Sequence, residues 1–138
     1  MIALDTNVIA RFYVDDPSDP QAAAQRPIAR GIFEESTALF VPATVILELE
    51  WVLRAFYGFS AAQFAKVVTH LAGLPHVTLE SAPTVLAALD AHVGGLDFAD
   101  ALHLGCSSSC EAMVSFDDRG FARKAARLKL QPPVRVLA

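Results

Sequence analysis

The stretch IALDTNVIARFY, residues 2–13, combines the pattern of a short strand with that of a helix. Its first residues, Ile2–Leu4, are a short apolar run that predicts a strand, and the residues from about Asn7 to Tyr13 are typical of a helix. An acidic residue, Asp5, directly follows the strand. The rest of the chain repeats this order of short strand and helix.

Short apolar runs predict four more strands, at Leu39–Val41, His76–Leu79, Ala112–Phe116 and Val134–Leu137. Cap residues and glycines mark the helices between them, which run from Thr44 to before Gly58, from Ser60 to near Gly73, from Ser81 to Gly94, onward from a cap at Asp97, and over Arg119–Leu128. Gln21–Glu35 is also helical in composition, but Pro27 is expected to break or kink it.

Strands joined through single helices need crossover connections, which make the sheet mainly parallel and cover both of its faces. The predicted class is therefore α/β, with a mainly parallel central sheet of about five strands. A length of 138 residues without a repeat or linker predicts a single domain over residues 1–138.

The hydrophobic fraction of 54 % is high, which indicates either a generous core or a surface covered by a partner. The longest apolar region, Ala38–Phe56, is interrupted by proline and charged residues, so no membrane span is expected. Asp5 stands where the apolar run of a signal peptide would begin. With two cysteines, Cys106 and Cys110, the chain fits a reducing compartment, and we expect a cytoplasmic protein.

The net charge of −4 is unevenly distributed. Residues 1–118 hold five Lys or Arg and all fifteen Asp and Glu, whereas residues 119–138 hold six Lys or Arg and no acid. Arg119, Arg123 and Arg127 share one face of the last predicted helix. A solvated surface is one interpretation of this face, and contact with the phosphates of a polyanion is the other.

Four acids come from four separate segments of the predicted fold. Asp5 and Asp117 each directly follow a strand, Asp100 is in the first turn of its helix, and Glu48 is about one turn into the helix after the second strand. Ligands of parallel α/β folds bind beyond the carboxyl ends of the strands. We therefore expect these four acids at one edge of one sheet.

The helix Thr44–Phe56 separates two glutamates. Its apolar arc, centred near Val45, includes the position of Glu48, whereas Glu50 falls on the opposite side and can pair with Arg54 as a surface acid. A carboxylate on an apolar face needs a partner, because its desolvation is costly. Glu48 is therefore the candidate site residue.

Converging carboxylates repel one another, by up to ~4 kcal/mol for a close pair at an effective dielectric of about 20. A divalent cation turns this repulsion into attraction, and an all-oxygen ligand set suits Mg²⁺ or Mn²⁺ rather than zinc. Such a cation can activate water and stabilise a phosphoryl oxygen. The predicted chemistry is metal-dependent hydrolysis of phosphodiester bonds.

Each acid also has a purely structural interpretation. Asp5 could cap the helix that follows it, and Asp100 could belong to a solvated helix face. Asp117 and Asp118 are adjacent, and one of them is expected to cap the helix at Arg119.

Four segments resemble, in order, the motifs of the PIN-domain nucleases, and in particular of the VapC-like toxins of toxin–antitoxin pairs. IALDTNVIARF resembles the first motif, with Asp5 as its acid and Thr6 and Asn7 as polar neighbours. TVILELEWVLRAFYG resembles the second and places Glu48 at the family's glutamate. GLDFADALHLG resembles the third, with Asp100 as its acid and Asp97 as an additional one; MVSFDDRGFARKA resembles the fourth, with Asp117 as its acid and Ser115 at the family's hydroxyl position.

The resemblance covers Met1 to about Leu128. It implies a three-layer fold and an endoribonuclease that cleaves single-stranded RNA with Mg²⁺ or Mn²⁺. It also implies a homodimer that a cognate antitoxin protein inhibits. Under this interpretation the polyanion met by Arg119, Arg123 and Arg127 is RNA.

Two other functions compete with the nuclease. One is a phosphohydrolase that uses Asp5 as a covalent nucleophile, but this chemistry normally needs a second aspartate two residues later, where the chain has Asn7. The other is a non-catalytic domain of the same fold that serves as a binding module. The presence of all four acids argues against it.

Overall fold

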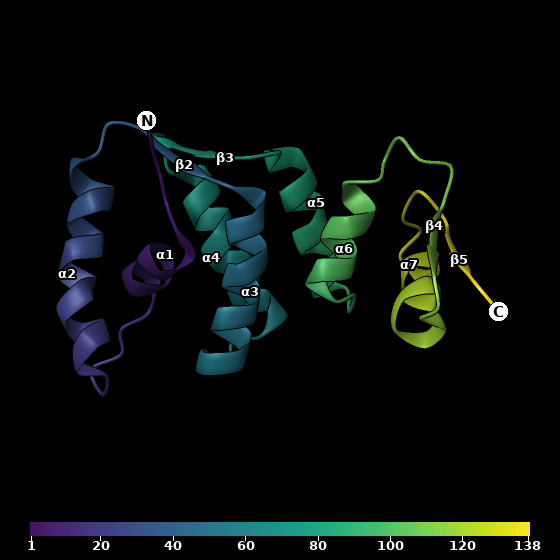
Figure 1. Cartoon of the computed structure of the whole chain (residues 1–138), viewed down its shortest axis with the longest axis horizontal. Helices are drawn as coiled ribbons and strands as arrows, with labels where there is room; N and C mark the ends of the chain where they lie inside the picture. Colours follow the sequence, from purple (N-terminus) through teal and green to yellow (C-terminus); the bar gives the residue numbers. More distant parts are fainter. The chain divides into compact units, whose positions relative to one another are not determined.

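The predicted alternation of strands and helices is present, and the fold class is α/β. The computed structural model describes all 138 residues. They divide into an N-terminal unit, residues 1–82, and a C-terminal unit, residues 83–138 (Figure 1). The five strands all pair in parallel, three of them in the N-terminal unit and two in the C-terminal unit.

The N-terminal unit contains three strands and four helices. In chain order they are β1 (Ile2–Ala3), α1 (Thr6–Tyr13), α2 (Pro20–Glu35), β2 (Leu39–Val41), α3 (Ala43–Tyr57), α4 (Ala61–Gly73) and β3 (Val77–Leu79). The strand β2 is central, since Leu39 pairs with Ile2 of β1 and with Val77 of β3. Its apolar side chains Leu39 and Val41 are fully buried, which explains the strength of the sequence signal there. The helix α1 packs against both α2 and α3 (Figure 1).

The C-terminal unit contains one parallel strand pair and the remaining helices. In chain order they are α5 (Ala82–Val93, its first residue the last of the N-terminal unit), α6 (Phe98–Gly105), β4 (Met113–Ser115), a π-helical turn η1 (Asp118–Ala122), α7 (Arg123–Arg127) and β5 (Val134–Val136). The prediction of one regular helix over Arg119–Leu128 is therefore wrong in its first part. The π-helical turn begins one residue earlier, at Asp118.

The predicted first residue is the cap in α4 but not in α3. Ser60 caps α4 in a capping box with Gln63, as its sequence predicts. Thr44, by contrast, is not the cap of α3, because Pro42 occupies that position without a side-chain hydrogen bond. The Glu80 carboxylate accepts a hydrogen bond of 2.8 Å from the Ala43 amide instead, so a residue distant in sequence satisfies the start of this helix.

The helix α2 continues through Pro27, which corrects the expected break. Asp19 caps its start by accepting hydrogen bonds from the amides of Gln21 and Ala22. Pro27 removes the donor for the carbonyl of Ala23. Both residues are exposed, so this carbonyl can be hydrated, and the cost of the proline is small enough for the helix to persist.

The high apolar fraction supplies both a core and part of the surface. Buried side chains include Ile9, Leu53 and Phe64, whereas Trp51 and Phe56 of α3 are 51 % and 66 % exposed. No helix is long and apolar enough to cross a membrane.

Candidate active site

Asp5 lies just beyond β1 and is the N-cap residue of α1. Its Oδ1 atom accepts a hydrogen bond of 2.8 Å from the amide of Thr6. The capping role that the sequence left open is therefore real, but it uses only one carboxylate oxygen. The side chain is exposed, so Oδ2 remains available for a ligand.

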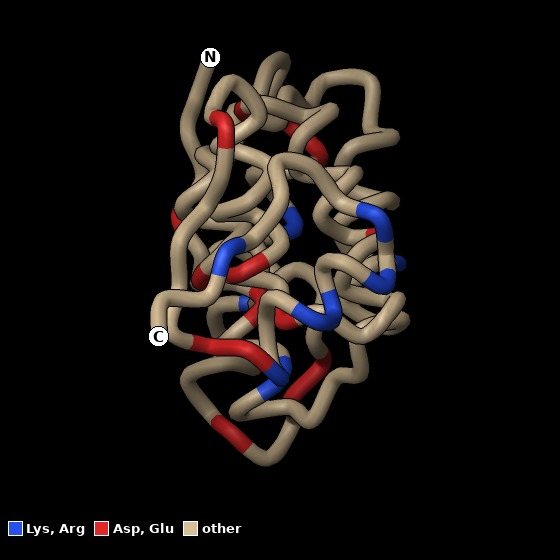
Figure 2. Tube along the Cα trace, turned by 90° about the vertical axis from the view of Figure 1, so that its right-hand side faces the viewer, with Lys and Arg blue, Asp and Glu red and all other residues tan.

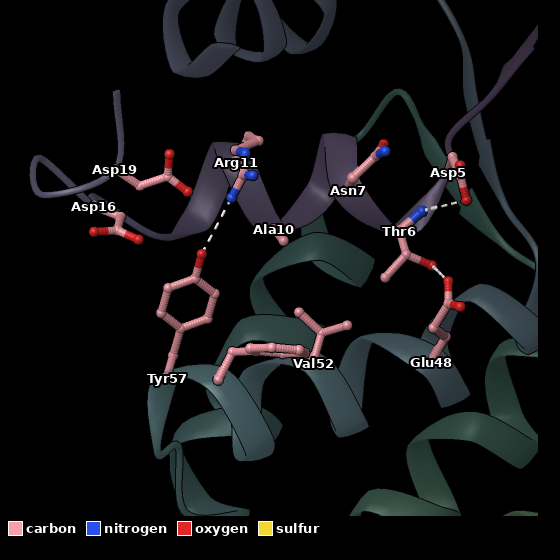
Figure 3. Close-up of a pocket in the computed structure, with 11 residues that line it drawn as sticks. Asp5, Thr6, Asn7, Ala10, Arg11, Asp16, Asp19, Glu48, Val52 and Tyr57 are labelled. Carbon is pink, nitrogen blue, oxygen red and sulfur yellow. Dashed lines mark hydrogen bonds between the residues drawn. The ribbon is translucent and has the colours of Figure 1, made fainter. Parts of the chain in front are cut away.

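Thr6 connects Asp5 to Glu48. Thr6 is only 4 % exposed, and its hydroxyl donates a hydrogen bond to Glu48 Oε1 (Figure 3). Its amide is the group that binds Asp5. The start of α1 and the second turn of α3 thus bring two acidic side chains to one place in the N-terminal unit.

These residues line one end of a pocket of about 620 Å³ between α1 and α3 (Figure 3). Asn7 lies beside Asp5 along α1 and also lines the pocket. Farther along, Arg11 reaches from α1 toward Tyr57 at the end of α3. Sequence reasoning missed Arg11, although its i, i+4 spacing from Asn7 places both side chains on one face of α1.

The orientation predicted for α3 is wrong, because its buried side chains are Ile46, Leu49, Glu50 and Leu53. Glu50 is 5 % exposed and Glu48 is exposed, the reverse of the expectation. The predicted Glu50–Arg54 pair does form, with an N–O distance of 2.8 Å, and it makes the burial of this carboxylate tolerable. Glu48 therefore lines the pocket from an exposed position of α3 that faces α1, and it does not lie on the apolar face of α3.

The C-terminal unit holds a second group of acids. Asp97 is the N-cap of α6 and accepts a hydrogen bond of 3.3 Å from the amide of Asp100. The Asp100 side chain lies in the first turn of α6 and is partly buried. Burial raises the pKa of Asp100, and the charges of Asp97 and Asp117 raise it further, whereas His103 and Lys124 lower it. Asp100 and Asp117 are therefore close enough to interact electrostatically.

Asp117 follows β4 and caps η1, so it is the residue of the Asp117–Asp118 pair that has the capping role. Its Oδ1 accepts a hydrogen bond of 2.8 Å from the Gly120 amide, and its own amide donates one of 3.0 Å to the Ser115 hydroxyl. A Cβ atom on Gly120 would lie 2.6 Å from Asp117 Oδ2. A side chain at position 120 would therefore displace the Asp117 carboxylate from its place over the turn. Gly120 was not predicted as a site residue, although a glycine inside a predicted helix is a signal for such a position.

Residues 119–138, which hold six Lys or Arg and no acid, follow directly after Asp117 and Asp118. Figure 2 shows the charged positions along the trace. Arg123 forms an ion pair of 2.9 Å with Asp118, and Arg127 donates a hydrogen bond of 3.2 Å to the carbonyl of Gly94. Arg119 has no such partner, and all three arginines are exposed. The π-helical turn changes the angular spacing between Arg119 and the other two.

Neither group of acids forms a complete metal site by itself, since no three His, Cys, Asp or Glu side chains are arranged to hold an ion. The donors nevertheless fit a hard divalent cation. The pocket of the N-terminal unit is lined by carboxylate, hydroxyl and amide oxygens and by no His or Cys. Asp5 and Glu48 are exposed, so both remain accessible to a ligand.

Comparison with known protein families gives a match that covers most of the chain. The family model of the PIN domain matches residues 2–127, which span most of the chain and parts of both units. A search among curated proteins gives no match.

Proposed function

The chain belongs to the PIN-domain family, whose members are generally metal-dependent nucleases, and from this premise we propose that it is an endoribonuclease that cleaves single-stranded RNA with Mg²⁺ or Mn²⁺. The observation that carries the proposal is the link from Asp5 through Thr6 to Glu48 at one end of an open pocket. Two exposed carboxylates held together in this way are poised for a cation.

We propose further that Asp100 and Asp117 complete the metal site, and that residues 1–138 act as one domain. The family match supports this, because it runs across both units. The raised pKa of Asp100 also supports it, since a partly buried carboxylate beside other carboxylates is stabilised by a cation. Asp97 caps α6, and we propose that its role is structural.

When bound, the cation would activate water and stabilise negative charge on a phosphoryl oxygen. The protein's own residues provide positioning. Thr6 fixes Glu48 through its hydroxyl and Asp5 through its amide, so the two carboxylates are oriented before a ligand arrives. The Gly120 amide orients the Asp117 carboxylate, and the Ser115 hydroxyl accepts a hydrogen bond from the backbone amide of Asp117. Such preorganisation favours metal binding because fewer rotamers must be ordered.

We propose that Arg119 contacts RNA phosphates next to this site. It is exposed and makes no ion pair, whereas Arg123 and Arg127 are already engaged with Asp118 and Gly94. The two engaged arginines can still add to the positive potential that attracts RNA.

We propose that the chain is a cytoplasmic toxin of the VapC-like kind, which forms a homodimer and is inhibited by an antitoxin. The exposed aromatic side chains of α3 support the existence of a protein partner. Trp51 and Phe56 are packed edge to face, with their ring centroids 5.3 Å apart, and both are more than half exposed. Exposed aromatic side chains, and tryptophan in particular, are enriched at protein–protein interfaces.

The activity is tested with a labelled single-stranded RNA and the full chain. We expect cleavage in Mn²⁺ or Mg²⁺, none in EDTA, and none from Asp5→Asn in either condition. Single-stranded DNA and double-stranded RNA serve as comparison substrates. Undiminished cleavage in EDTA would exclude the metal-dependent mechanism, and cleavage of the DNA alone would exclude the proposed substrate.

A further inference from the structure

The pocket between α1 and α3 has a second end, away from Asp5 and Glu48 (Figure 3). Arg11 lies there and is the one cationic side chain that lines the pocket. Arg11 is six positions after Asp5, which corresponds to about 9 Å along the helix axis. This length is comparable with that of one nucleotide.

The guanidinium of Arg11 is held in place by two neutral groups. Its Nε donates a hydrogen bond of 2.9 Å to Gln25 Oε1, and one terminal nitrogen donates one of 3.1 Å to the Tyr57 hydroxyl. No carboxylate lies within ion-pair distance of Arg11. Its charge is therefore fixed in direction without being neutralised, a combination suited to binding an anion.

The surroundings of Arg11 limit what that anion can be. Asp16 and Asp19 line the pocket beyond it (Figure 3), and their charges oppose a run of several phosphates there. Phe56 also lines the pocket, and its ring is 66 % exposed. An exposed aromatic ring near a fixed guanidinium offers stacking for a base and a charge for a phosphate.

We propose that Arg11, Tyr57 and Phe56 form a subsite for one nucleotide of the single-stranded substrate, adjacent to the acids that bind the metal. Arg11 binds the phosphate of this nucleotide, Tyr57 positions the guanidinium, and Phe56 stacks on the base. The subsite rests on the proposed nuclease function but concerns a different step, because it holds the strand and does not contact the cation.

The test compares binding of a short labelled single-stranded RNA by the full chain, measured by fluorescence anisotropy at several salt concentrations with Ca²⁺ present. Loss of one phosphate contact lowers the slope of log Kd against log salt by about 0.7 for a single strand. We expect this decrease and weaker binding for Arg11→Gln. Arg30→Gln, with the same charge change on exposed α2, should keep the wild-type slope.

Two further variants keep the proposal testable if Arg11→Gln is poorly folded. Tyr57→Phe removes only the hydroxyl and should weaken binding while leaving the salt slope unchanged, because the charge remains. Phe56→Ala removes an exposed ring and should weaken binding by at least about fivefold. Wild-type binding by both variants would overturn the subsite.

Wild-type affinity and slope for Arg11→Gln, or equal losses in Arg11→Gln and Arg30→Gln, would also overturn it. Cleavage assays in Mn²⁺ on the same samples separate the two proposals. If the wild-type protein cleaves RNA and Arg11→Gln binds normally, the subsite is wrong and the nuclease stands. If the variants weaken binding as expected but the wild-type protein cleaves no RNA, the subsite stands and the nuclease is wrong.

Discussion

The hydroxyl of buried Thr6 donates a hydrogen bond to Glu48 Oε1, across 42 positions of sequence. This contact joins the first turn of α1 to α3. It occupies one oxygen of Glu48 and leaves the other for a ligand. We therefore expect Thr6 to affect metal binding, although it carries no charge itself.

Replacing Thr6 with valine keeps the volume and removes the hydroxyl. Glu48 then loses its orienting partner, and we expect Mn²⁺ affinity to fall about tenfold to a hundredfold, the usual effect of losing a group that orients a metal ligand. Thr6→Ser retains the hydroxyl and should retain most of the affinity. Isothermal titration calorimetry measures both, and equal affinities for the two variants would contradict the role.

Gly120→Ala tests the position of Asp117. The added Cβ would lie 2.6 Å from Asp117 Oδ2, so the carboxylate must move. We expect weaker Mn²⁺ binding and lower RNA cleavage, with far-ultraviolet circular dichroism close to wild type. Gly31→Ala is the matched control, since its Cβ has no neighbour nearer than 3.9 Å. Wild-type metal affinity in Gly120→Ala would show that Asp117 is not a ligand.

Asp97 and Asp100 are expected to respond differently to substitution. Asp97→Ala removes the cap of α6 and should cost about 1 kcal/mol of stability while leaving cleavage in place. Asp100→Asn should abolish cleavage while keeping or raising the melting temperature of the metal-free protein. The opposite pattern would make Asp97 the ligand.

The pH dependence of the Asp100→Asn effect follows from its pKa. Burial, with Asp97 and Asp117 nearby, raises the pKa of Asp100 above its value in the unfolded chain. Folding therefore favours the protonated carboxyl, so ionisation lowers the stability of the protein as the pH rises from the unfolded pKa to the folded pKa. The gain in melting temperature on Asp100→Asn should be present at neutral pH and disappear below about pH 4.

Glu48 and Glu50, two residues apart on α3, are expected to differ in their effects on stability and metal binding. Glu50→Gln removes the charge of a buried carboxylate that pairs with Arg54, so we expect a lower melting temperature and normal Mn²⁺ affinity. Glu48→Gln should have the reverse effect, with stability kept and metal affinity lost. Thermal melts with and without Mn²⁺ distinguish the two, and loss of metal binding in Glu50→Gln alone would reverse the assignment.

Local signals in the sequence predicted many of the elements. Strand β2 and the caps Ser60 and Asp97 follow from short-range patterns, namely a buried apolar run and side chains that bind nearby amides. The helix break predicted at Pro27 is absent, because the carbonyl of Ala23, which loses its donor, is exposed and can be hydrated. Thr44 is not the cap because Glu80, which directly follows β3, accepts the hydrogen bond from the first amide of α3.

The orientation of α3 could not be obtained from its sequence. Apolar residues lie on nearly all sides of this helix, so its hydrophobic direction is poorly determined, and pairing with Arg54 lets Glu50 be buried. The positions of Asp5 and Glu48 depend on long-range packing between α1 and α3. The motif pattern predicted both as site residues, whereas Arg11 and Gly120 became candidates only from contacts in the structure.

We propose that acids from both units hold the catalytic cation together. The most direct measurement is Mn²⁺ binding by calorimetry to the full chain, to Glu48→Gln in the N-terminal unit and to Asp100→Asn in the C-terminal unit. Because neither unit has three ligands arranged for an ion, we predict that the wild-type chain binds Mn²⁺ and that each single variant binds it at least about tenfold more weakly. Wild-type Mn²⁺ affinity in either variant would contradict the claim.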